Sequence, residues 1–306
     1  GANYPLVCAN LVRGKTLAAN PRDDDLYLKP YVILDRMVKD GEGAEHKLRV
    51  GVIGFVPPQI MVWDARHLSG NVMTRDIVQA AAAWVPQMKE EGADLVIALS
   101  HSGIDANKTE MMENASLFLG QIEGIDAIFT GHQHLVFPGK NFMGLEGVDA
   151  EKGTLFGKPA VQAGFWGSHM GLIDLLVERD GNSWKVVDST VENRPIYERV
   201  ERKVNPLVES TAAVEATVRS EHESTLAYVR TPVGNTSAPL YSYFALVADD
   251  PSVQIVSQAQ TWYVKDLLKD GEHKELPVLS AAAPFKAGGR GGPDYYTDVP
   301  AGSIAI

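Results

Sequence analysis

Three short apolar runs, separated by segments with helical periodicity, constrain the fold most strongly. The runs span residues 47–56, 94–100 and 126–130. Between the first two lies an amphipathic segment that is expected to begin as a helix at Thr74, and its apolar residues recur every three or four positions: Ile77, Ala81, Trp84 and Met88. Runs without polar alternation are typical of strands buried on both faces of a parallel sheet. The sequence therefore predicts an α/β domain.

The other segments complete a two-domain chain. In the first part we expect a strand, a solvated acidic loop, a second helix, and then short strands with glycine turns, at residues 4–10, 22–25, 109–119 and 146–184. A long helix at about 205–229, with Pro206 in its first turn, is expected to join the two domains. A helix at 253–268 and a strand at 276–282 are expected to follow.

Composition excludes several classes of protein. The chain has 306 residues, 45% of them hydrophobic, with a formal net charge of −11. This charge argues against an extended basic surface for a nucleic-acid polymer, although a pocket for a small phosphorylated ligand is compatible with it. No apolar run reaches the roughly 18 residues of a membrane span. The one cysteine, Cys8, cannot form an internal disulfide. Because the first residues contain no basic n-region and no apolar h-region, we expect no signal peptide within this chain.

Two of the three predicted strands end in histidine. Ser100-His101-Ser102-Gly103 follows the second run, and Gly131-His132-Gln133-His134 follows the third. Sites in open α/β sheets form outside the carboxyl ends of the strands, and histidine is the commonest metal ligand. A single histidine there would more often be structural, but two neighbouring strands ending the same way favour a metal site.

These two motifs, at this separation, resemble the second half of a calcineurin-type metallophosphoesterase. Residues 54–64 and 278–286 resemble one branch more closely, the periplasmic 2′,3′-cyclic-nucleotide 2′-phosphodiesterase/3′-nucleotidases of the 5′-nucleotidase family. The resemblance runs from residue 3 to residue 306. It implies an α/β fold made of the C-terminal half of an α-β-β-α sandwich (residues 1–197), a linker helix (198–231), and the start of an α+β substrate-binding domain (232–306).

The resemblance also implies a two-metal hydrolase of 2′,3′-cyclic nucleotides and 3′-nucleotides, monomeric and periplasmic. In the family pattern, His101 and His132 bind the second divalent ion and His134 binds the first; these ligand types suit Zn, Mn or Fe. The first half of the family's ligand set does not occur in this sequence. The catalytic histidine is therefore expected before Gly1, so we expect an active parent protein and an inactive isolated chain.

A glycine-rich segment at 287–292 carries the candidate substrate residue. Arg290 matches, in position, the arginine-bearing loop of the family's substrate domain, and guanidinium suits bidentate binding of phosphate or carboxylate. The aromatic clamp for the base is expected beyond Ile306, so Tyr295 and Tyr296 are not assigned to it. Among the weaker candidates, His169 is expected to make a structural hydrogen bond, His67 to be solvated, and Asp105 and Asn107 to cap a loop.

Two alternatives remain open at this point. Within the hydrolases, the chain could belong to a 5′-nucleotidase or UDP-sugar hydrolase, although residues 57–61 and 283–285 disfavour this. In a different class, it could be a non-catalytic nucleotide-binding or structural fragment. A nucleotide is the expected partner if the protein is a hydrolase of either branch.

Overall fold

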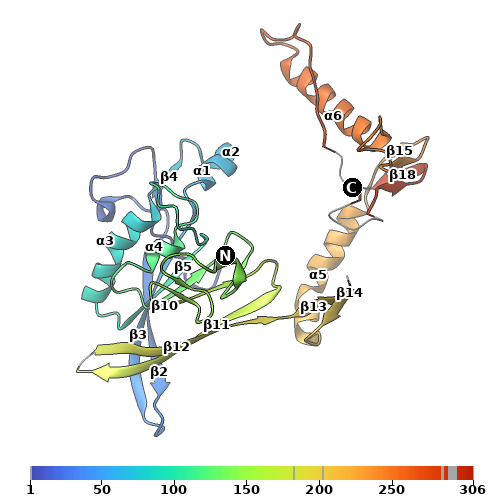
Figure 1. The fold of residues 1–306 in the computed structure, drawn as a ribbon. Helices are drawn as coiled ribbons and strands as arrows, with labels where there is room; N and C mark the ends of the chain where they lie inside the picture. Colours follow the sequence, from blue (N-terminus) through green and yellow to red (C-terminus); the bar gives the residue numbers. More distant parts are fainter. Residues whose placement is uncertain (1, 182, 202, 284–285, 289–294, 306) are drawn as a thin grey trace. The chain divides into compact units, whose positions relative to one another are not determined.

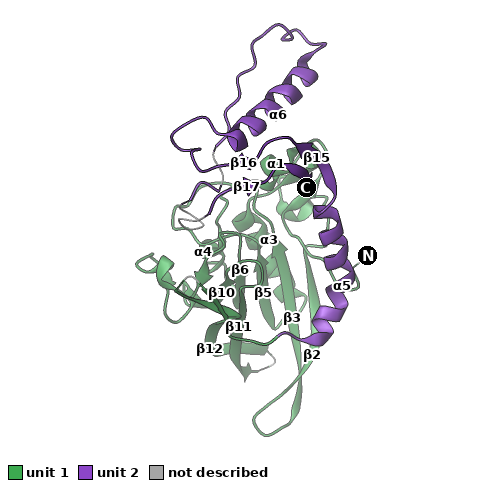
Figure 2. Ribbon diagram, turned by 90° about the vertical axis from the view of Figure 1, so that its right-hand side faces the viewer, with its two compact units in different colours: residues 1–209 green, residues 210–306 purple. Residues whose placement is uncertain are grey.

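The structure, a computed structural model, describes residues 2–181, 183–201, 203–283, 286–288 and 295–305. The chain divides into two compact units, Gly1–Glu209 and Ser210–Ile306 (Figure 2). Within the described residues, no helix combines the length and the apolar character needed to cross a membrane. The domain bounds expected from the resemblance, 1–197, 198–231 and 232–306, stay a prediction.

A mixed sheet forms the centre of the first unit (Figure 1). Its strand order is β2–β3–β5–β6–β10–β9–β8, and β7 pairs with β10. The strands β3, β5, β6 and β10 run parallel to one another, whereas β2 joins β3 antiparallel. The bounds are β2 Tyr31–Lys39, β3 Glu45–Phe55, β5 Leu95–Ser100, β6 Ala127–Thr130, β7 Val136–Phe137, β8 Val148–Asp149, β9 Thr154–Leu155 and β10 Lys158–Ala163. The three predicted apolar strands are thus confirmed as β3, β5 and β6.

One face of this sheet is buried beneath helix α3, Ile77–Glu90, which contacts β5, and helix α4, Ser116–Leu119, which contacts β6. A row of residues that pair across neighbouring strands lies on this face, and each of them is 0% exposed: Ile53, Ala98, Ile128 and Ala160. A β-carbon on Gly51 would lie 2.6 Å from Met88 Cε, which shows how closely α3 approaches β3. The helix begins after Asp76, whose Oδ1 accepts a hydrogen bond from Gln79 N at 2.9 Å. The predicted amphipathic helix is confirmed, with its start three residues later than the expected Thr74.

The opposite face carries the next row of register partners, Leu99, Phe129 and Val161. Val161 is covered by the hairpin of β11 (His169–Asp180) and β12 (Ser183–Pro195), because a β-carbon on Gly171 would lie 2.8 Å from its Cγ2. Leu99 and Phe129 are 43% and 37% exposed. The two faces of the central strands are therefore covered unequally.

Smaller elements complete the two units. In the first unit these are β1 Leu11–Arg13, the 3-10 helix Pro21–Asp23, α1 Ile60–Trp63, α2 Ala65–Leu68, β4 Val72–Thr74, α4 Ser116–Leu119, the 3-10 helix Lys140–Phe142, β13 Tyr197–Val200 and β14 Lys203–Pro206. The second unit contains α5 Ala212–Val229, β15 Pro232–Thr236, β16 Leu240–Tyr241, α6 Pro251–Leu268, β17 Asp298–Val299 and β18 Gly302–Ala305. The pairs β1–β4, β13–β14, β15–β18 and β16–β17 are antiparallel.

The acidic loop at 22–25 is only partly solvated, contrary to expectation. The Asp24 side chain is 1% exposed and forms a bidentate ion pair with Arg75, with distances of 2.5 Å to Nε and 2.9 Å to Nη2. Arg75 Nη2 also donates to Ala18 O at 2.7 Å. The carboxylate compensates the buried guanidinium, which a sequence window of four residues could not reveal.

Three predicted elements in other parts of the chain are also wrong. The helix expected at 109–119 is limited to α4, Ser116–Leu119. At residues 4–10 there is no strand but an isolated bridge between Val7 and Lys29. Residues 276–282, which lie within the described part, form no strand.

The long helix starts later than expected. Pro206 ends β14 and pairs with Tyr197, so it belongs to a hairpin and not to a first helical turn. Helix α5 begins at Ala212 and ends at Val229. The predicted helix at 253–268 is confirmed as α6, where Pro251 occupies the first turn and Asp250 caps it.

Candidate functional site

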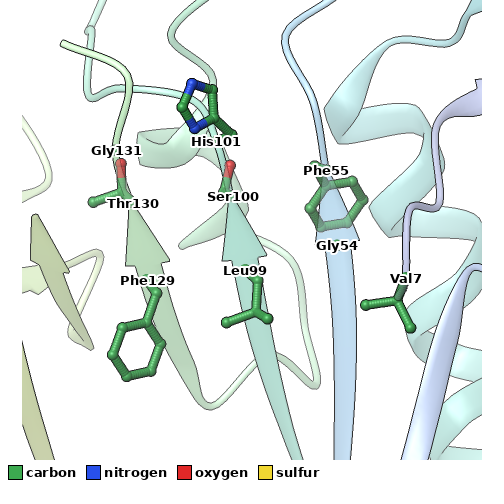
Figure 3. Close-up of a pocket in the computed structure, with 9 residues that line it drawn as sticks. All are labelled: Val7, Gly54, Phe55, Leu99, Ser100, His101, Phe129, Thr130 and Gly131. Atoms are coloured by element: carbon green, nitrogen blue, oxygen red, sulfur yellow. The ribbon is translucent and has the colours of Figure 1, made fainter. Parts of the chain in front are cut away.

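His101 and His132 come together at the carboxyl ends of β5 and β6. The first follows Ser100 directly, and Figure 3 shows its ring above the ends of the two strands. His101 N donates to Phe55 O at 3.0 Å, which continues the β3–β5 pairing past the last strand residue. The ring centroids of His101 and His132 are 5.3 Å apart.

His134 is exposed, as His101 is, and it rests on a different side chain. Its ring stacks on Phe165, with centroids 5.5 Å apart and an interplanar angle of 25°. In the part of the chain that the structure describes, no three His, Cys, Asp or Glu side chains are grouped so that they could hold one metal ion. The structure therefore brings together His101 and His132, and places His134 beside them on a different aromatic support.

The surroundings of His101 favour the neutral form of its imidazole. Burial lowers the pKa of His101 from its ordinary value, and the neighbouring His132 and His134 lower it further. Burial disfavours the charged form, and nearby imidazoles that can carry positive charge act in the same direction. A neutral imidazole has a ring nitrogen with a free lone pair, which is the form that binds metals.

The loop after β6 takes an unusual backbone path. His132 and His134 both have positive φ, 71° and 59°, and Gln133 N donates to Gly131 O at 2.8 Å. Side chains with a β-carbon rarely adopt this left-handed region. The positive φ angles at residues 132 and 134 turn the backbone sharply. The side chains of His132 and His134 therefore contact different neighbours.

Gln133 ties this loop to the loop after β5. Its Oε1 accepts from Ile104 N at 2.8 Å, and its Nε2 donates to Ile104 O at 3.2 Å. The amide lies against Gly103, where a β-carbon would be 2.2 Å from Gln133 Cδ. Gln133 therefore fixes the spacing of the two histidine-bearing loops, a role that the sequence motif did not reveal.

Two further contacts act on His132. Its Nε2 is 2.6 Å from Glu113 Oε1. The Trp63 ring stacks on the imidazole, with centroids 5.1 Å apart and an interplanar angle of 26°. Sequence reasoning assigned neither residue. Trp63 lies in the segment 54–64 that carried the resemblance, but Glu113 lies in a segment that was expected to be helical, and no sequence signal distinguished it.

A pocket of about 300 Å³ lies beside His101 on the less covered face of the sheet (Figure 3). Its walls combine apolar side chains with polar groups at the strand ends: Val7, Gly54, Phe55, Leu99, Ser100, His101, Phe129, Thr130 and Gly131. This volume is at the lower end for small-molecule sites, so it suits a small group better than a whole nucleotide.

The weaker candidates lie outside this cluster. His169 Nδ1 is 2.9 Å from Ser168 Oγ, which is the structural hydrogen bond expected. Asp105 Oδ1 accepts from Asn107 N at 2.8 Å, as expected for a capped loop. His67 is exposed in α2. Arg290, the predicted substrate residue, lies outside the described residues.

Comparison with known sequences finds relatives along the whole chain, although no model of a protein family matches it. The chain is 46% identical over 308 residues to the trifunctional nucleotide phosphoesterase protein YfkN of Bacillus subtilis, and spans 20% of that protein. It is 42% identical over 309 residues to the 2′,3′-cyclic-nucleotide 2′-phosphodiesterase/3′-nucleotidase of Salmonella typhimurium, and spans 46% of that protein. Both matches cover 100% of this chain. The chain thus spans less than half the length of either relative.

Comparison with solved structures agrees. The crystal structure of calcineurin-like phosphoesterase YfkN from Bacillus subtilis matches with a TM-score of 0.67 and 40% identity, over 76% of this chain and 65% of that chain. A putative 5′-nucleotidase from Staphylococcus aureus matches with a TM-score of 0.53 and 18% identity, over 86% of this chain and 45% of that chain, which shows a shared fold alone. Because sequence and fold agree along so much of its length, the chain belongs to the calcineurin-like phosphoesterase family.

Proposed function

We propose that the protein containing this chain hydrolyses phosphate esters of nucleotides, with 2′,3′-cyclic nucleotides and 3′-nucleotides as substrates. The observation that carries the proposal is the pairing of His101 and His132 at the ends of adjacent parallel strands, with ring centroids 5.3 Å apart. The names of the relatives from Salmonella typhimurium and Yersinia enterocolitica, each 42% identical to the chain, support the substrate class.

Calcineurin-like phosphoesterases use divalent metal ions, and the donor chemistry at the strand ends fits such ions. Partial burial and two neighbouring imidazoles lower the pKa of His101, which favours the neutral form whose lone pair can bind a metal ion. We assign His101 and His132 to one ion and His134 to a second, which agrees with the separate support of His134 on Phe165. When bound, the ions would act as Lewis acids that stabilise negative charge on the phosphate. The imidazole ligands suit Zn, Mn and Fe alike.

The chain's own residues would shape the pocket for the phosphate end of the substrate. The partly exposed side chains of Leu99 and Phe129 would form an apolar wall of the pocket beside His101. Arg290 stays a predicted contact for phosphate or carboxylate. A monomeric state, a periplasmic location, and a catalytic histidine outside this chain also stay predictions.

The experiment uses a protein of the length of the curated relatives that carries this chain. It measures ring opening of 2′,3′-cyclic AMP and phosphate release from 3′-AMP and 5′-AMP. We expect turnover of the first two, loss of activity on chelation, and recovery with a divalent cation. His132→Ala should lower kcat together with metal content, and His67→Ala, on the exposed helix α2, serves as the matched control.

Two results would contradict the proposal. A preference for 5′-AMP would favour the 5′-nucleotidase alternative, for which the sequence support is a 5′-nucleotidase from Diplobatis ommata, 23% identical over 216 residues. The absence of any hydrolysis with metal present would favour a non-catalytic nucleotide-binding or structural role.

A further inference from the structure

We propose that Glu113 is a positioning residue for His132, and that its carboxylate selects the imidazole nitrogen that faces a ligand. The inference rests on the proposed function in so far as it assigns a metal to His132. Glu113 would touch neither the metal nor the substrate and would act through the imidazole.

Glu113 and His132 are in direct side-chain contact. Glu113 Oε1 lies 2.6 Å from His132 Nε2, which is at the short end for an N–H···O hydrogen bond. A carboxylate is an acceptor only, so Nε2 must be the nitrogen that carries the proton. In the neutral ring, Nδ1 then holds the lone pair. The carboxylate thus selects Nδ1 as the nitrogen that can bind a cation.

The His132 ring is held on more than one side. The His132 side chain is 18% exposed, and Trp63 stacks on it at 5.1 Å between centroids. A 180° flip of the ring about χ2 would place Cε1 where Nε2 now lies and would break the hydrogen bond to Glu113, and stacking on the indole limits any tilt of the ring. Stacking and hydrogen bonding therefore restrain the same orientation.

Hydrogen bonds to Ser102 hold the backbone that carries the Glu113 carboxylate. Ser102 Oγ donates to Glu113 O at 2.6 Å and accepts from Ala115 N at 2.7 Å. The backbone of Glu113 is thus bound to the residue that follows His101, while its side chain is bound to His132. One residue thereby links the two histidine-bearing loops.

These contacts match a general pattern of metal sites. A histidine ligand usually donates its second ring N–H to a carboxylate or carbonyl, which fixes the tautomer and makes the other nitrogen more basic. Loss of such a partner typically lowers metal affinity about 10- to 100-fold. Glu113 is the side chain that makes this contact to His132 among the described residues.

The test compares Glu113→Ala and Glu113→Gln with the unchanged 306-residue chain. Both substitutions leave the backbone bonds to Ser102 in place, and thermal unfolding checks that the variants remain folded. Glu110→Gln is the matched control, because Glu110 is exposed in the same loop. The first readout is the ring ¹⁵N NMR spectrum of His132 in the metal-free chain, at about pH 8.5, where imidazole is neutral. The second is the affinity for Co²⁺, measured by calorimetric titration.

We expect the Nε2–H tautomer in the unchanged chain and a mixture of tautomers in Glu113→Ala. Glu113→Gln, which keeps an acceptor oxygen, should retain the tautomer. Co²⁺ affinity should fall about 10- to 100-fold in Glu113→Ala, less in Glu113→Gln, and not in Glu110→Gln. An unchanged tautomer in Glu113→Ala would overturn the inference, and so would an unchanged Co²⁺ affinity. If the unchanged chain binds no Co²⁺, its incomplete ligand set accounts for that result: the tautomer measurement alone then decides the role of Glu113, and chelation of the longer protein tests the metal assignment.

Discussion

The Gln133 side chain occupies the space that a β-carbon on residue 103 would need, and its amide pairs with both backbone polar groups of Ile104. The distances are 2.2 Å from the β-carbon position to Cδ, 2.8 Å for the bond from Ile104 N, and 3.2 Å for the bond to Ile104 O. Gly103 is thus required by its neighbour in the other loop. The Ser-His-Ser-Gly and Gly-His-Gln-His motifs are parts of one packed arrangement.

Gly103→Ala should displace the Gln133 amide and break both bonds to Ile104. We expect a loss of about 1–3 kcal/mol in the free energy of unfolding, because buried polar groups lose their partners. Co²⁺ affinity should fall as well, since the His132 loop would move. Urea unfolding and calorimetric titration measure the two effects. Gly41→Ala is the control, because no atom lies within 4 Å of its β-carbon position; equal effects of the two substitutions would contradict the argument.

The buried Asp24–Arg75 pair gives a second prediction. Asp24→Ala leaves the Arg75 guanidinium, whose side chain is 8% exposed, without its carboxylate. Breaking a buried pair from one side typically costs about 3–5 kcal/mol. The matched control is Asp25→Ala, because Asp25 is 78% exposed and pairs with Arg13 at 3.8 Å; we expect a change of about 0.5 kcal/mol or less. A cost for Asp24→Ala as small as that of the control, measured by urea unfolding, would refute the pairing.

Ile128 and Phe129 are adjacent in β6 but face opposite sides of the sheet. Ile128 is 0% exposed on the face that α3 and α4 cover, whereas Phe129 is 37% exposed in the pocket beside His101. Ile128→Ala should therefore cost about 2–5 kcal/mol of unfolding free energy. Phe129→Ala should cost clearly less, although it removes the larger side chain. Chemical denaturation of both variants decides the point, and the reverse order would mean that the second face is the better packed one.

Because of the Tyr31 hydroxyl, we expect the free energy of unfolding to fall at alkaline pH. It donates to Glu91 Oε1 at 2.7 Å, and burial followed by this carboxylate raises the pKa of Tyr31 to about 12. The folded state therefore holds this proton more tightly than the unfolded state, where the pKa is about 10. The resulting stability is fully present below about pH 10 and is lost as the pH rises toward 12.

Tyr31→Phe should consequently show a shallower fall of the unfolding free energy with pH above about pH 10 than the unchanged chain. Urea unfolding at a series of alkaline pH values measures both slopes. Tyr4→Phe is the control, because Tyr4 is 66% exposed. Identical slopes for the Tyr31→Phe variant and the unchanged chain would show that the hydroxyl is not differentially protonated.

The predictable parts of the fold were those that depend on local pattern. The apolar runs that became β3, β5 and β6, and the stripe that became α3, carry their burial in their own sequence. The helix predicted at residues 109–115 is absent because polar groups of this segment bind the neighbouring loop. Asn114 Oδ1 accepts from Gly103 N at 3.2 Å, and Ala115 N donates to Ser102 Oγ. The prediction that Pro206 lies in the first turn of a helix was wrong because Pro206 pairs with Tyr197, in the preceding strand of a hairpin.

The site divides in the same way. The sequence could place His101 and His132 at the ends of strands, because strand ends are visible in the hydrophobic pattern. It could not identify Glu113 or Trp63, whose contacts with His132 depend on how three loops pack together. Nor could it show that His134 would rest on Phe165.

The backbone at residues 132 and 134 is costly to maintain. A residue with a β-carbon in the left-handed region costs roughly 1–2 kcal/mol, whereas glycine pays no such steric cost. Selection of this chain for thermal stability alone should therefore replace both histidines by glycine, while selection that also demands activity should keep them. Retention of both histidines in an evolving population would thus indicate that selection still acts on the activity of the protein.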